Sequence, residues 1–148
     1  MELNLHTDLA LRALLLLAVV DPEVLSAAQI AERHRVSHTH IQKVIQALRR
    51  EGFVTTRRGP GGGVRLARPA SEIRIGDVVR AMEPHMRLVV CFDANDESCV
   101  LAGSCGLTGA VHRATAAFLA ELDATTLADV SRPKRHLLDR LNASMTAR

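Results

Sequence analysis

The run GFVTTRRGPGGGVRLARP, residues 52–69, constrains the fold more than any other part of this sequence. Within it, two short β-prone stretches, 53–58 and 64–68, are separated by four glycines and one proline. A Gly- and Pro-rich connection between two such stretches predicts an antiparallel β-hairpin with a flexible tip. The tip carries little side-chain bulk, which allows a close approach to another surface. A nucleotide-binding loop is excluded, because the Lys and Ser/Thr of a P-loop are missing.

Two helices are predicted directly before the hairpin. Ser26 and Gln29 have the spacing of a capping box, which opens a short helix. After a turn at residues 33–36, Ser37 is the predicted N-cap of a second helix, in which apolar residues recur at positions 41, 44, 45 and 48. A short helix, a four-residue turn and a second helix make the layout of a helix-turn-helix.

The opposite face of the second helix is polar and could contact DNA. Such side chains donate to bases and phosphates, although a polar face is just as typical of a helix that is merely solvated. Residues 33–68 carry nine Lys and Arg against one acid, Glu51, a local charge of +8 in a chain of net charge +3. This concentration of positive charge fits a phosphate-backbone partner, with a plain solvated surface as the alternative. The candidate DNA-contacting residues are Ser37, His38, Thr39, His40, Gln42 and Lys43 in the helix and Arg57, Arg58, Gly61, Gly62, Gly63 and Arg65 in the hairpin.

These elements predict a mainly α-helical fold with a small β-hairpin. Residues 1–84 are expected to form a winged helix-turn-helix DNA-binding domain, with the hairpin at about 53–68 as its wing. Residues 107–130 are expected to form one long helix. It carries a narrow apolar stripe of small side chains at 107–122, which a single domain of this size would leave uncovered. We therefore expect a homodimer through the 107–122 helix. The polar tail, 131–148, receives no role.

All three cysteines, Cys91, Cys99 and Cys105, lie in one polar loop, assigned to residues 85–106. With seven and then five residues between them, they can converge on one soft cation or an iron–sulfur cluster. Ordinary buried cysteines are an alternative, but the acidic loop is a poor core segment. Disulfides are weaker still, because the count is odd and no secretory signal precedes them.

The first helix is predicted from Thr7, as its N-cap, to about Val20, with Asp8 in its first turn. Its apolar stretch is interrupted by Arg12 and is too short to cross a bilayer, so no membrane partner is expected and the location is expected to be cytoplasmic. An enzyme is also not expected, because no Cys and His pair shares an obvious site.

The wing run and the segment HTDLALRALLLLA, residues 6–18, resemble the Rrf-two family of bacterial transcription regulators. The resemblance covers about residues 1–130 and includes the three cysteines after the wing. It implies a homodimeric repressor of double-stranded operator DNA that carries an iron–sulfur cluster. The gap between Cys91 and Cys99 is longer than is usual in the family.

The resemblance also bears on the fourth ligand. Two-iron members of the family have a His two or three residues after the last cysteine, where this chain has Leu107 and Thr108. The context TDLALRAL is instead similar to the nitric-oxide-sensing members, in which a carboxylate reaches the cluster from the partner subunit. This implies a four-iron cluster (4Fe-4S) held by Cys91, Cys99, Cys105 and Asp8 of the partner subunit, with nitric oxide or redox stress as the signal. A two-iron cluster (2Fe-2S), zinc or a thiol switch remain alternatives.

Overall fold

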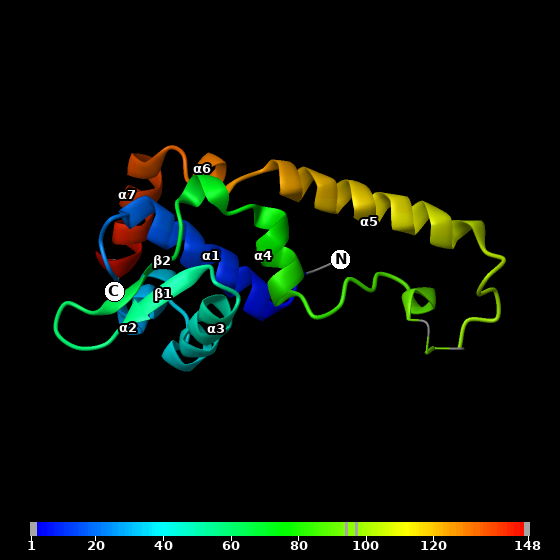
Figure 1. Cartoon of the computed structure of the whole chain (residues 1–148), viewed down its shortest axis with the longest axis horizontal. Coiled ribbons are helices and arrows are strands. Elements are labelled where there is room, and N and C mark those ends of the chain that lie inside the picture. The colour runs from blue at the N-terminus through cyan, green and yellow to red at the C-terminus, as the bar shows by residue number, and fades with distance from the viewer. Residues whose placement is uncertain (1–2, 94, 97, 147–148) are drawn as a thin grey trace.

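The structure, a computed structural model, describes residues 3–93, 95–96 and 98–146. A helical body carries one long helix that projects from it as an arm, with the cysteine loop at the far end of the arm (Figure 1). The mainly α-helical fold with one hairpin is confirmed. The elements in chain order are α1 (Leu5–Val20), α2 (Ala27–His34), α3 (His38–Arg50), β1 (Val54–Arg57), β2 (Gly63–Leu66), the 3-10 turn η1 (Ala70–Glu72), α4 (Ile75–Met82), the 3-10 turn η2 (Val90–Phe92), α5 (Gly106–Ala124), α6 (Leu127–Val130) and α7 (Lys134–Thr146).

The first helix, α1, is the centre of the body and is buried along most of its length. It begins three residues earlier than predicted, because Asn4 is the N-cap and accepts a hydrogen bond from the Thr7 amide at 2.8 Å. Thr7 lies inside the first turn with 0% exposure, and its hydroxyl donates to Glu83 at 2.8 Å. The predicted N-cap at Thr7 was therefore wrong, because its hydroxyl satisfies a tertiary contact instead of the helix end. No helix among the described residues is long and apolar enough to cross a membrane.

The predicted helix-turn-helix is present as α2 and α3. The Ser26–Gln29 capping box forms with both of its hydrogen bonds, and Arg35 ends α2 in the left-handed region with φ 53°. Ser37 occupies the N-cap position of α3, although its side chain makes no capping hydrogen bond. The buried residues of the two helices face each other and α1 and are Ile30, Ala31, Ile41, Val44, Ile45, Ala47 and Leu48.

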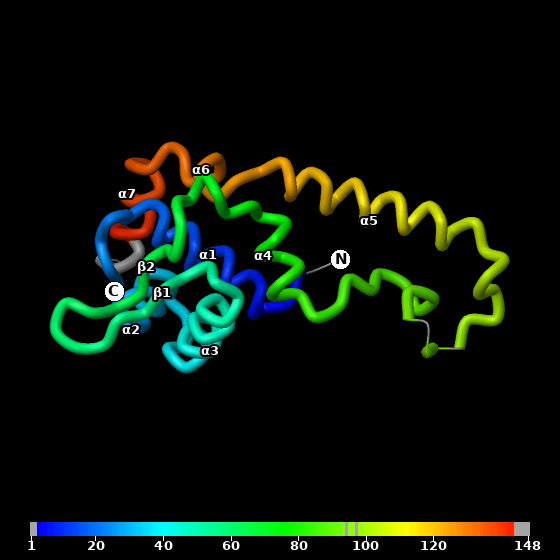
Figure 2. The backbone as a smooth tube through the Cα atoms, in the orientation of Figure 1, coloured from blue at the N-terminus to red at the C-terminus, as the bar shows by residue number. Residues whose placement is uncertain are grey.

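The predicted wing is an antiparallel pair with Val54 opposite Leu66 and Arg57 opposite Gly63. Its loop projects clear of the helices (Figure 2). At the tip, a Cβ on Gly62 would lie 2.3 Å from the Arg57 carbonyl oxygen, so only glycine fits at this position of the turn. Backbone hydrogen bonds between Leu25 and Val64, at 3.2 and 2.8 Å, fasten the wing to the body.

The chain after α5 differs from the expectation. The long helix ends at Ala124, six residues before the expected boundary at 130, and residues 127–146 return to the body as α6 and α7. Leu127 is 1% exposed, and its amide donates to the Ile73 carbonyl at 2.8 Å. Leu138 and Leu141 of α7 pack against the core, and α7 lies beside α2 and α1. The segment expected to be a polar tail therefore packs against the core through half-buried leucines.

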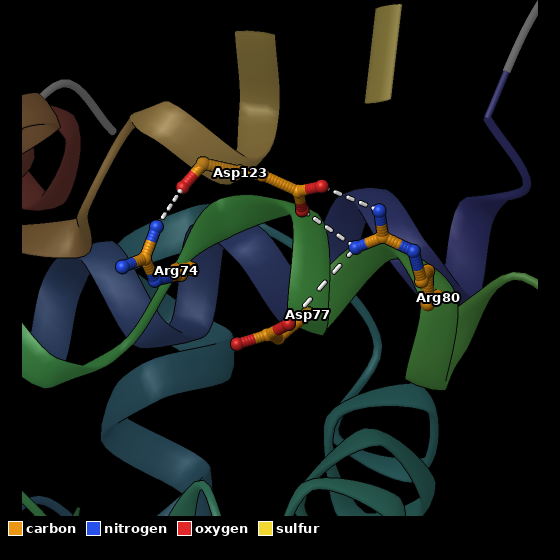
Figure 3. Close-up of polar contacts among 4 residues, drawn as sticks. All are labelled: Arg74, Asp77, Arg80 and Asp123. Carbon is orange, nitrogen blue, oxygen red and sulfur yellow. Dashed lines mark hydrogen bonds and ion pairs between the residues drawn. The ribbon is translucent and has the colours of Figure 1, made fainter. Parts of the chain in front are cut away.

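One polar cluster joins α4 to the end of α5 (Figure 3). The Arg80 guanidinium donates to both carboxylate oxygens of Asp123 at 2.6 Å, and Arg74 donates to the Asp123 carbonyl at 2.7 Å. Hydrogen bonds from Arg80 hold the pKa of Asp123 below its usual value, so this carboxylate stays charged. Gly76 lets the two helices approach, because a Cβ there would lie 1.9 Å from Asp123 Oδ1. We call Arg74, Arg80 and Asp123 the arm clamp, since they fix the direction of α5 against the body.

Candidate nucleic-acid interface and cysteine pocket

All the side chains of α3 and its N-cap that were predicted from the sequence to contact DNA are exposed. Ser37, His38, Thr39, His40, Gln42 and Lys43 are all exposed, and Gln46 and Arg50 extend the same polar face. The apolar stripe beneath them is buried, so these side chains are directed outwards by the packing of α3 on α1 and α2. Hydroxyl, amide and ammonium groups on one exposed helix can reach base edges and phosphates of a major groove.

The wing adds a second polar surface next to this helix, because β1 packs against α3. Arg57, Arg58 and Arg65 are exposed, and the Arg65 Nε donates weakly to the Thr55 hydroxyl at 3.4 Å. Gly61 is exposed at the tip. Gly62 and Gly63 are half-buried, and a Cβ on Gly63 would lie 2.7 Å from the Leu25 carbonyl oxygen, so that glycine serves the attachment of the wing to the body.

The first turn of α1 touches α3 through a small pocket that the sequence did not reveal. His6 and Leu5 of α1 line it together with His40 and Lys43 of α3, and its volume is about 200 Å³. Two of the candidate DNA-contacting residues thus border the segment that carries Asp8. No periodicity in the sequence marks such a contact, since it depends on how two helices cross.

The three cysteines line one cavity of about 420 Å³. The loop that carries them lies at the far end of the arm (Figure 1). Cys91 lies in η2, Cys99 in the following loop and Cys105 at the N-cap of α5. All three are free and half-buried. The helix dipole of α5 favours negative charge at its N-terminus, where Cys105 lies. The rest of the lining is mostly apolar and consists of Val89, Val90, Ser98, Leu101, Leu107 and Thr108.

This donor set suits a thiolate-ligated cluster. Among the described residues, no three His, Cys, Asp or Glu side chains lie close enough together to hold a single metal ion. Three thiols from three segments border one cavity, and thiolate is the donor that both iron–sulfur clusters and soft cations take. The polar loop is held by its own turns, in which Asp93 accepts from the Asn95 amide and Asp96 from the Ser98 amide, at 3.0 and 2.9 Å. Hydrogen bonds from the side chain and the backbone of Ser98 keep the pKa of Asp96 below its usual value.

Asp8 does not line the cysteine cavity of its own chain. It lies in the first turn of α1, in the body, and its carboxylate pairs with Arg12 at 2.7 Å. The structure therefore brings the three cysteines together but leaves the predicted fourth ligand apart from them within one subunit. The Asp8 side chain is 38% exposed, so another chain can reach it.

Two contacts near the cysteines escaped the sequence analysis. The Thr108 hydroxyl lies 3.3 Å from the Cys91 sulfur. One turn later on α5, His112 stacks on Phe92, with ring centroids 4.0 Å apart. Both contacts join residues that are far apart in the chain, so no local pattern in the sequence marks them.

Comparison with known proteins agrees with this architecture. The Rrf2 family model, described as an iron-dependent transcriptional regulator, matches residues 3–133. The HTH-type transcriptional regulator NsrR of Bacillus subtilis (strain 168) is 42% identical over 139 residues, which is 93% of this chain and 95% of that one. The NsrR of Geobacillus kaustophilus (strain HTA426) is 44% identical over 131 residues, 88% of this chain and 89% of that one.

Solved structures show the same fold. CymR, described as the global cysteine regulator of B. subtilis, superposes with a TM-score of 0.73 at 25% identity, covering 88% of this chain and 96% of that one. IscR of T. potens gives a TM-score of 0.68 at 26% identity, covering 88% and 85%. The relatives are transcriptional regulators, not enzymes, as expected for this chain. With the family model matching residues 3–133 of 148, the chain belongs to the Rrf2 family of transcriptional regulators.

Proposed function

We propose that this protein is a homodimeric repressor that binds double-stranded operator DNA through α3 and the wing, and whose DNA binding depends on an iron–sulfur cluster. The cluster would be a four-iron one, held by Cys91, Cys99, Cys105 and Asp8 of the partner subunit, and nitric oxide would be the signal. The observation that carries the proposal is the convergence of three thiols from three segments on one cavity at the end of the arm. The NsrR name of relatives at 42% and 44% identity supports the same choice.

A dimer is supported by the arm itself. Helix α5 has no fully buried residue over its 19 positions, although it carries apolar side chains along one stripe. Large apolar side chains stay exposed around its cysteine end, with Val100 at 95% and Leu107 at 62%. A second copy of the helix packed along this stripe would cover them, and a twofold axis would present two α3 helices to two half-sites.

The resemblance to the nitric-oxide-sensing members implies Asp8 as the fourth ligand, because Asp8 lies in the similar TDLALRAL context. Residues 106–108 after Cys105 are Gly, Leu and Thr, none of which supplies the imidazole of two-iron members. A carboxylate oxygen is a harder ligand for iron than thiolate, which leaves that iron the more open to an incoming ligand. When bound, the cluster supplies iron that reacts with nitric oxide. The residues of this chain supply the cavity, the ligands and the connection to the DNA-binding body.

The proposal is tested on full-length protein purified without oxygen. We expect a brown protein with about four iron and four sulfide per subunit if the cluster is the four-iron type. Operator fragments would be selected by the protein from a pool of random duplex DNA, and their binding would then be measured as nitric oxide is added. Loss of binding together with loss of the visible spectrum supports the proposal. A colourless protein that contains zinc, or one whose DNA binding responds only to thiol oxidation, would contradict it.

A further inference from the structure

We propose that Thr108 and His112 of α5 are positioning residues for Cys91: the Thr108 hydroxyl donates a hydrogen bond to the Cys91 sulfur, and the stack of His112 on Phe92 holds η2 against the arm. This inference rests on the proposed cluster, whose ligand Cys91 would be. It makes Cys91 the ligand that is fixed in place before the cluster binds.

The two contacts join the same two elements at neighbouring points. Cys91 and Phe92 are consecutive in η2, while Thr108 and His112 are four residues apart on α5 and so lie on one face of that helix. The sulfur and the hydroxyl oxygen are 3.3 Å apart, within the range of a hydrogen bond to sulfur. The rings of Phe92 and His112 lie 4.0 Å apart with an angle of 18° between their planes. Two contacts fix the position of the short turn, where one would leave it free to pivot.

Thr108 differs from the other described threonines of the arm and its end. Thr115 donates to the Val111 carbonyl at 2.9 Å, and Thr125 donates to the Glu121 carbonyl at 3.0 Å. Donation to the carbonyl four residues earlier is the ordinary behaviour of a helical threonine. The hydroxyl of Thr108 instead lies beside a thiol 17 residues away in the chain. This geometry assigns Thr108 to the cysteine site.

The chemistry of the pair fixes the direction of the hydrogen bond once a metal is bound. A ligating cysteine is a thiolate and has no proton to donate, so the hydroxyl is the donor. Donation to a thiolate stabilises the negative charge on sulfur and orients the ligand. Hydrogen bonds to cluster sulfurs are among the factors that set the reduction potential, and stabilised negative charge favours the reduced state. The apolar walls contributed by Val89, Val90 and Leu107 strengthen the effect, because few other dipoles compete there.

The test compares Thr108→Val, which keeps the shape and removes the hydroxyl, with Thr108→Ser, which keeps the hydroxyl. Thr115→Val is the matched control, because it removes the same group from the same helix at a site bonded to backbone. In the protein carrying its cluster, Thr108→Val should lower the reduction potential and speed the loss of iron to a chelator about tenfold or more. Thr108→Ser and Thr115→Val should stay close to the parent.

A second measurement needs no cluster. Backbone amides of η2 and its end donate within the turn, Phe92 to Val89 and Asp93 to Val90, both at 3.0 Å. In metal-free protein, Thr108→Val and His112→Ala should speed amide hydrogen exchange in residues 90–93, whereas Thr115→Val should not. If the parent protein binds no cluster, the proposed function fails, while this exchange measurement still decides whether Thr108 and His112 hold η2. Parental potential, iron loss and exchange in Thr108→Val would overturn the inference.

Discussion

Asp8 has a weak local role in α1 and a proposed second role as a ligand of the partner's cluster. It lies in the first turn of α1 and pairs with Arg12, both side chains being partly exposed. An exposed pair four residues apart on a helix stabilises it by only about 0.3–0.5 kcal/mol. The fold therefore has little need of this carboxylate. A strong effect of its removal would have to come from a second site, the cluster of the partner subunit.

We predict that Asp8→Ala leaves the protein folded and changes the proposed cluster. The helix-dipole contribution that it removes is about 0.3–1 kcal/mol and the ion-pair contribution about 0.3–0.5 kcal/mol, too little to unfold the protein. The visible spectrum should shift, and the cluster should be lost faster to nitric oxide. Arg12→Ala is the matched control, because it breaks the same ion pair and keeps the carboxylate, and its spectrum should stay parental. If Asp8→Ala had the spectrum and nitric oxide response of the parent, the fourth ligand would have to be sought elsewhere.

His34 is a partly buried side chain that the sequence did not single out. It ends α2 close to Arg12 and Asp8, and its Nε2 is buried without a hydrogen-bond partner among the described residues. Burial, the largest cause, and the nearby Arg12 charge lower the pKa of His34 below its ordinary 6.5, against the opposing effects of a hydrogen bond with the Arg12 backbone and of the Asp8 charge. The folded protein therefore prefers the neutral imidazole.

The sign of the resulting pH dependence follows from this lowered pKa. The unfolded chain binds a proton at higher pH than the folded one, so the contribution is fully present above about pH 6.5 and is lost as the pH falls toward the folded pKa. We predict that denaturant unfolding midpoints fall between about pH 7 and pH 5, and that His34→Gln makes this fall shallower. An equal fall in His34→Gln and in the parent would assign the pH dependence to other groups.

Among the elements, those with local signals followed from the sequence. The capping box of α2, the apolar stripe of α3 and the glycines of the wing each specify their own element, and the observed bounds lie within a few residues of those expected. The end of α5 and the whole of α7 did not follow. They are set by tertiary contacts, in which Leu127 enters the core beside Ile73 and α7 packs on α2. The spacing of Leu138 and Leu141 was the available signal for an amphipathic helix in that segment.

The cysteine pocket, too, could be predicted from the sequence only in part. Its three thiols were evident because their spacing within one loop is a local property. The contacts that shape it were not, because Thr108 and Cys91 meet only when α5 folds back along η2.

At the scale of the wing and α3, we predict that Arg58→Ala lowers the salt dependence of operator binding. Removing one phosphate-neutralising charge from each subunit reduces the slope of log affinity against log salt by roughly two for the dimer, at about 0.9 per phosphate. Gln42→Ala provides the contrast, because a neutral side chain on α3 releases no counterion and should instead relax the choice among operator sequences. Affinity measured against salt for both variants separates the two roles. An unchanged slope in Arg58→Ala would mean that this arginine does not neutralise phosphate.

In the whole molecule, the arm clamp connects the two ends of the proposed sensor. The cysteine pocket lies at the far end of α5, and α5 meets the body where Arg80 holds Asp123 through two hydrogen bonds (Figure 3). In the proposed dimer, a rigid arm of 19 residues would turn a small displacement at one end into a change in the relative placement of two DNA-binding bodies. Removing the Arg80–Asp123 contacts should make the α4–α5 junction easier to bend, while each body should still fold and expose its own α3.

We predict that Asp123→Ala weakens binding to an operator with two half-sites about 5- to 100-fold and leaves binding to a single half-site near the parental value, because it uncouples two intact bodies. Asp77→Ala is the matched control. The Asp77 carboxylate also lies near Arg80, with 3.9 Å between Oδ1 and the guanidinium nitrogen, but Asp77 belongs to α4 and is not part of the arm clamp. Its binding to both DNA fragments should stay parental. Equal weakening of both fragments by Asp123→Ala would instead place the damage inside the body, whereas parental binding to both would show that the spacing of the two α3 helices is fixed by contacts other than the clamp.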